Sequence, residues 1–175
     1  MQNTILHTLE WLAEAADDPR DCLQSWDQAP GIPYPLIIGK TFDLVTTHRR
    51  VGERVLAFYD RDAIPAGGAL LDCGVAKVGF LVHRDPKSQP LTVALACDAR
   101  YRTRCLGLKG YLLAPVPVMD EDSLARSRVR WLRLPGPPGT HTFELPTLTA
   151  KLAEVASEGV AFPVDDVPPP APSYQ

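Results

Sequence analysis

Hydrophobic and polar positions repeat with two different periods along this chain. Apolar residues recur at intervals of three and four in four segments, about residues 3–16, 17–26, 50–62 and 146–159. This spacing places them on one side of a helix. In the second segment Asp18 is suited to cap the helix and Pro19 to begin it. The pattern therefore predicts helices near both ends and one in the middle.

Shorter apolar runs between these helices indicate strands. They cover about residues 36–47, 68–83, 110–117 and 127–135, and the run at 68–83 contains a glycine that suggests a hairpin. Residues 91–104 fit a helix or a strand equally well. Strands interrupted by helices predict an α+β fold, with a mixed β-sheet, flanking helices and a C-terminal helix.

The last residues differ from the rest. Residues 161–175 are rich in proline and contain two acids but no basic residue. Such a composition does not bury enough apolar surface to fold. We therefore expect a single α+β domain over residues 1–160, followed by a disordered proline-rich tail at 161–175.

Composition limits the class of protein. Hydrophobic residues make up 45% of the 175 residues, which is enough for a core, and the net charge is −3. No apolar run is long enough to span a membrane, and the N-terminus lacks the basic region of a signal peptide. These features predict a cytoplasmic protein that does not enter membranes. The four cysteines form no CxxC pair, so we expect no metal site and no cofactor.

Asp43 is the acid that first invites a catalytic interpretation, because it lies in an apolar strand. Alternate residues of a strand share a face, so Asp43 shares its face with Val45 and Thr47. A two-metal site needs two converging carboxylates. The position that would complete an Asp-x-Asp pair is Val45, which does not bind Mg²⁺.

Several stretches occur in an order that resembles the bifunctional primase-polymerase (prim-pol) domain family of actinobacteria. They are "EWLAEAADDPRDCLQSW", "GKTFDLVTT", "AKVGFLVHR" and "GYLLAPVPV…RVRWLRLP". The resemblance covers about residues 5–155 and implies an RNA-recognition-like core with added helices. Active members carry Asp-x-Asp and a motif histidine. Here Val45 replaces the second acid and Lys77 stands at the histidine position, which implies a degenerate member.

The resemblance therefore implies a non-catalytic binding or scaffolding protein rather than a polymerase. Such a protein would act through a protein partner, with weak binding of nucleotide or nucleic acid as a further expectation. The alternative is a small enzyme whose site is built on Asp43, His48 and His83. These groups must converge on one substrate for that alternative to hold.

Two other groups of residues are candidate binding sites. Thr47 can cap the helix that follows it, so an anion could bind among Thr47, His48, Arg49 and Arg50. Between Arg100 and Arg133 the chain has a net charge of +5. Alternating arginines there could follow a phosphate backbone or simply face solvent; they are Arg100, Arg102, Arg104, Arg126, Arg128 and Arg130. Alternation places the aromatic residues Tyr101 and Trp131 on the opposite face, which favours the solvent-facing interpretation.

Overall fold

The computed structural model describes residues 2–84, 103–106, 110–117 and 128–158. The helices are α1 (Gln2–Ala13), α2 (Pro19–Gln28), α3 (Arg49–Arg61) and α6 (Leu145–Ser157). The strands are β1 (Tyr34–Ile37), β2 (Phe42–His48), β3 (Ala69–Asp72), β4 (Lys77–His83), β5 (Arg104–Leu106), β6 (Tyr111–Ala114) and β7 (Val129–Arg133). The predicted α+β class with a C-terminal helix is confirmed. In the described ranges no helix is long and apolar enough to cross a membrane.

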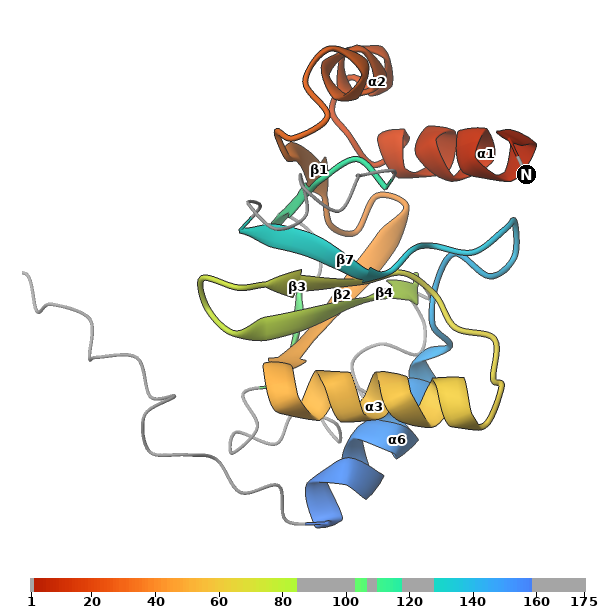
Figure 1. The fold of residues 1–175 in the computed structure, drawn as a ribbon, viewed down its shortest axis with the longest axis vertical. Coiled ribbons are helices and arrows are strands. Elements are labelled where there is room, and N and C mark those ends of the chain that lie inside the picture. Colours follow the sequence, from red (N-terminus) through yellow and green to blue (C-terminus); the bar gives the residue numbers. More distant parts are fainter. Residues whose placement is uncertain (1, 85–102, 107–109, 118–127, 159–175) are drawn as a thin grey trace, which may run out of the picture.

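The strands form two sheets (Figure 1). One has five strands in the order β5-β2-β4-β3-β7, and the other consists of β1 and β6. Every pairing between these strands is antiparallel, whereas the sequence predicted a mixed sheet. Within the described residues the sheet contains no parallel pair because β4 lies between β2 and β3. These two strands run in the same direction, and each pairs with the oppositely directed β4. A parallel bridge joins Val82 of β4 to Phe143, which precedes α6.

The predicted hairpin is formed by β3 and β4, with Ala69 opposite Phe80 and Asp72 opposite Lys77. Its turn is stabilised by the Asp72 carboxylate, which accepts a hydrogen bond of 2.8 Å from the Gly74 N–H. Ala76, near the end of the turn, has a φ of +49°. The hairpin therefore ends in a tight connection directly beside the start of α3, where the Arg49 N–H donates to the Ala76 carbonyl at 2.8 Å.

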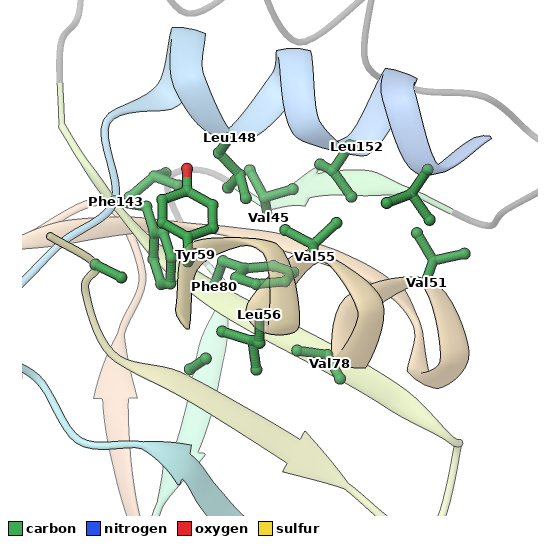
Figure 2. Close-up of a cluster of buried hydrophobic side chains, with 14 of the residues drawn as sticks. Val45, Val51, Val55, Leu56, Tyr59, Val78, Phe80, Phe143, Leu148 and Leu152 are labelled. Carbon is green, nitrogen blue, oxygen red and sulfur yellow. The ribbon is translucent and has the colours of Figure 1, made fainter. Parts of the chain in front are cut away.

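One face of the five-stranded sheet packs against α3 and α6, and Figure 2 shows the side chains between them. We call this cluster the helix-side core. It contains Val45, Val78, Phe80 and Val82 from β2 and β4, with apolar residues of both helices. Phe143, just before α6, contacts Tyr59 and Phe80 edge-on, with ring centroids 5.0 and 5.2 Å away. These contacts fix α6 against α3.

The opposite face of the sheet packs against β1, β6 and the first two helices. Leu44, Leu70, Leu81 and Trp131 belong to this second core together with Trp26 of α2. The predicted start of α2 is confirmed, because the Asp18 carboxylate accepts hydrogen bonds from two backbone N–H groups at the helix start, at 2.9 and 3.1 Å. The sheet thus separates two apolar cores, and both faces of β2 are buried along its length.

The contact between α3 and β4 depends on Gly52, since a Cβ placed there would lie 2.4 Å from the Cβ of Val78. We expect Gly52→Ala to lower the free energy of unfolding by roughly 1–3 kcal/mol through overpacking. Helix propensity alone predicts a gain of about 1 kcal/mol. Urea unfolding measures the change, and Gly31→Ala is the matched control because nothing lies within 4 Å of the added Cβ. A stabilised Gly52→Ala variant would contradict the packing described here.

Candidate functional site

A groove lies on the face of the five-stranded sheet that is opposite α3 and α6. It is lined by residues of the sheet and of β6, and it has a volume of about 470 Å³. Alternation along the strands decides which side chains line it. They include Leu44 and Thr46 of β2, Leu70 and Asp72 of β3, and Lys77 of β4. The groove therefore crosses the centre of the sheet rather than one edge.

Gly79 makes room for the groove in the middle of β4. It lines the groove without a side chain, and a Cβ placed there would meet the Leu44 Cδ1 atom at 3.1 Å. A glycine inside a central strand weakens the strand and often marks a place where a ligand or another backbone comes close. This glycine in "AKVGFLV" is the signal by which sequence reasoning could have found the groove, but it was not used.

One end of the groove is polar. Asp72, Lys77 and Arg128 line it, so two cations stand beside one acid. The Arg128 Nε lies 3.2 Å from the Asp72 carboxylate, which also accepts the Gly74 N–H at 2.8 Å. The carboxylate is therefore already engaged by two donors. The net charge of these three side chains is positive, which favours an anionic group at this end.

The rest of the groove is apolar, and part of its lining is open to solvent. Leu44 and Leu70 form the floor, and Leu112 contributes from β6. At the mouth, Tyr111 and Leu113 are 68% and 52% exposed. Exposed apolar residues that gather at one place are unusual on a monomer and often mark a binding surface.

Asp43 does not face the groove. It is 2% exposed and pairs with Val82, a member of the helix-side core. Burial raises the pKa of the Asp43 carboxyl, and the nearby positive charge of Arg84 opposes that shift. The Oδ2 atom has no hydrogen-bond partner among the described residues. The strand thus holds Asp43 as a buried acid under the helices, on the face that carries Val45 and Thr47.

The three groups of the predicted enzyme site do not converge. Lys77 lies opposite His48 and Phe42 lies opposite His83, so the two histidines occupy opposite ends of the β2–β4 ladder. Alternation places both of them on the groove side of the sheet, whereas Asp43 is on the other side. One substrate cannot reach all three groups in this arrangement.

The predicted anion site at the start of α3 has a different cap from the one expected. His48 is the capping residue, and its Nδ1 accepts the Arg50 N–H at 3.3 Å. Thr47 is fully buried, and its hydroxyl lies 3.0 Å from that of Thr103. Strand β2 continues one residue further than the sequence suggested, which moves the cap from Thr47 to His48.

A hollow of about 340 Å³ does lie at this helix start, lined by His48, Arg49, Arg50, Glu53 and Ala76. However, the Arg49 N–H already donates to the Ala76 carbonyl, and the Arg50 N–H to His48. The Arg49 guanidinium pairs with Glu53 at 2.7 Å. Two backbone donors are thus engaged and a carboxylate is present, so the hollow is less suited to an anion than its arginines suggest.

Only some of the alternating arginines that could follow a phosphate backbone lie within the described residues. Arg100, Arg102 and Arg126 lie outside the described residues, and of Arg104 the structure gives the position in β5 opposite Thr46. Arg128 is exposed at the polar end of the groove, and Arg130 is half-buried on β7.

Trp131, next to Arg130, is 9% exposed, and its indole N–H donates to the Pro115 carbonyl at 2.9 Å. Trp131 therefore belongs to the core and does not offer a surface on which bases stack.

Within the described ranges, no group of three or more histidine, cysteine or acidic side chains is placed to hold a metal ion. Models of protein families, curated proteins and solved structures were compared with this chain, and none matches it. The resemblance to the prim-pol family therefore stays a prediction from the sequence.

Asp43 yields a prediction about stability and pH. Its raised pKa means that the folded protein keeps this proton at pH values where the unfolded chain has lost it. The stabilising contribution is complete below the unfolded-state pKa of about 4 and is lost as the pH rises through the higher folded-state value. Asp43→Asn, which carries no charge, should thus be more stable than the wild type at neutral pH. The gain should shrink near pH 4.

Urea unfolding at the two pH values measures this difference. The control is Asp17→Asn, an exposed aspartate that should change stability by less than about 0.5 kcal/mol at either pH. If Asp43→Asn destabilises the protein equally at both pH values, the charge of the buried carboxylate does not lower the stability at neutral pH as described here.

Proposed function

We propose that this chain is a non-catalytic binding protein that accepts a nucleotide, free or as part of a single strand, in the groove of the five-stranded sheet. The observation that carries the proposal is the make-up of the groove. It has an apolar floor at one end and two cations with one acid at the other. A nucleotide combines a flat, largely apolar base with an anionic phosphate, and it matches both ends.

Size and chemistry support this choice. Small-molecule sites in proteins have volumes of roughly 300–1,000 Å³, apolar walls and a few polar groups that fix the ligand. The groove, at about 470 Å³, lies within that range. In the proposed arrangement the phosphate lies near Lys77 and Arg128, and the base lies over Gly79 beside Tyr111. Single-stranded nucleic acids are commonly bound by such pairing of cations with an aromatic face.

The arrangement of layers is compatible with the resemblance found in the sequence. RNA-recognition-like domains bind nucleic acid on the sheet face that their helices leave open. Here α3 and α6 cover one face (Figure 1). The groove lies on the other face, where β1, β6 and the first two helices also pack. The prim-pol family thus remains the proposed relative.

The positions of the acidic side chains support binding rather than catalysis. Two-metal transfer needs at least two carboxylates that converge on the ions. Among the groove-lining side chains of the described residues, Asp72 is the only carboxylate, and it is engaged by Arg128 and by a backbone N–H. Asp43 lies behind the sheet. In the proposed function the groove therefore binds the nucleotide without catalysing nucleotidyl transfer.

Protein contacts are the second part of the proposal. The exposed apolar residues that line the groove offer a surface that a partner protein could cover, in line with the scaffolding role expected from the sequence. They are Val75, Leu106, Tyr111 and Leu113.

Nucleotide binding can be measured by calorimetry with nucleoside triphosphates and by fluorescence anisotropy with a short single-stranded oligonucleotide. We expect Gly79→Val, which fills the groove, and Lys77→Gln, which removes a cation, each to weaken binding about tenfold or more, equivalent to about 1.4 kcal/mol. Arg20→Gln is the matched control, because Arg20 is exposed on α2. The proposal fails if no ligand binds the wild type, or if a correctly folded Gly79→Val variant binds as well as the wild type.

Polymerase activity provides a separate test. We expect the wild type to incorporate no nucleotides in primer extension with Mg²⁺ or Mn²⁺, because the groove has no pair of free carboxylates. Asp43→Ala should consequently leave the result unchanged. Template-dependent extension by the wild type, lost in a folded Asp43→Ala variant, would show that this protein is an active polymerase.

A further inference from the structure

The described chain ends beside the first half of α3, whose start contacts the β3–β4 turn. Helix α6 runs antiparallel to α3, because Phe143 before α6 contacts Tyr59 late in α3, while Glu158 after α6 pairs with Arg54 early in α3. Arg54 is five residues from Arg49, which corresponds to about 7.5 Å along a helix. The Arg49 N–H in turn donates to the Ala76 carbonyl of the β3–β4 turn, and the neighbours of Ala76, Val75 and Lys77, line the groove.

We propose that the segment after Glu158, residues 159–175, docks in the groove of its own chain and competes with other ligands there. This inference concerns the same groove as the proposed function. It depends on the lining of the groove and on the position of Glu158, not on which ligand the groove takes. Its consequence is regulatory, since a docked tail reduces the apparent affinity of every other groove ligand.

The segment is long enough to reach the groove. Six residues, 159–164, span up to about 20 Å when extended. The path from Glu158 follows the first turns of α3 and passes the β3–β4 turn at Ala76. The next residues, Asp165 and Asp166, then arrive at the end where Lys77 and Arg128 stand.

Charge and shape match along this path. The segment has two aspartates and no basic residue, whereas the polar end of the groove has two cations and one engaged acid. Phe162, Val164 and Val167 flank the aspartates and suit the apolar floor.

The prolines that follow add a further match. Residues 168–170 and 172 are prolines, which favour a polyproline II conformation without internal backbone hydrogen bonds. Such segments bind in grooves lined by aromatic residues, and Tyr111 is the aromatic residue of this one.

Charge exchange in the full-length chain tests the proposal. Methyl NMR of Leu44, Leu70 and Leu112 reports on the groove floor and wall. Replacing both acids (Asp165→Lys with Asp166→Lys) should shift these signals and lower the equilibrium constant for docking about five- to tenfold, the loss expected for two exposed ion pairs. Combining this change with Lys77→Glu and Arg128→Glu should restore docking. The control exchanges two exposed aspartates elsewhere, Asp17→Lys with Asp27→Lys, and should leave the signals in place.

Three outcomes would overturn the inference. The first is a groove spectrum that does not respond to the tail exchange. The second is a response that disappears on dilution together with a dimer in light scattering, because the tail would then dock on a second copy. The third is a combined variant that shows no recovery although it folds.

Nucleotide titration of the same variants separates this inference from the proposed function. If the tail docks but no nucleotide binds, the inference stands and the nucleotide proposal fails. If nucleotide binds equally to the wild type and to the tail-exchanged variant, the inference fails and the nucleotide proposal stands. If both hold, the tail-exchanged variant should bind nucleotide more tightly, by up to about five- to tenfold.

Discussion

The pairing of β2 with β4 is the constraint on which the rest of the structure depends. Seven consecutive residue pairs, from Phe42–His83 to His48–Lys77, join the two strands. Each strand has a further partner on its outer side, so every other element is positioned from this ladder. Both faces of β2 are buried. Burial of two apolar faces is the dominant favourable term for such a sheet, and a one-residue slip would exchange the faces of all its side chains.

This register also decides what each polar residue of β2 can do. Asp43 and Thr47 are fixed on the side of α3 and α6, where they are 2% and 0% exposed. Thr46 is fixed on the groove side. The acid that first suggested catalysis therefore lies on the face of the sheet that carries the helix-side core, while the position that faces the groove carries a hydroxyl. Desolvation raises the pKa of a buried carboxyl group. The charged form therefore lowers the stability of the fold, unless a cation or hydrogen-bond donors compensate.

The sequence was sufficient to predict features that depend on residues close together in the chain. Helix spacing located α2, α3 and α6, Asp18 marked the start of α2, and alternation gave the hairpin of β3 and β4. It was not sufficient for pairings between distant segments. Tyr34 pairs with Ala114, and no local pattern indicates that β1 and β6 are partners. The groove is lined by β6 as well as by the sheet, so its full lining could not be predicted before this pairing was known, although Gly79 marks its centre.

The same limit explains the errors at the candidate sites. Alternation correctly grouped Asp43 with Val45 and Thr47, but which group faces the helices depends on the packing of α3 and α6. The helix cap moved by one residue because pairing with Lys77 extends β2 through His48. Local propensity is compatible with either Thr47 or His48 as the cap, and the pairing of β2 with β4 selects His48.

The groove and the buried acid lie on opposite faces of the sheet. In this groove the only carboxylate among the described lining residues is engaged by Arg128 and the Gly74 N–H, so the polar end is net positive without any ion. A metal-dependent site needs cations to bind phosphate, whereas this one carries its own in Lys77 and Arg128. In the proposed arrangement, Lys77 and Arg128 lie beside the nucleotide phosphate, and the aspartates of the tail compete for the same two cations.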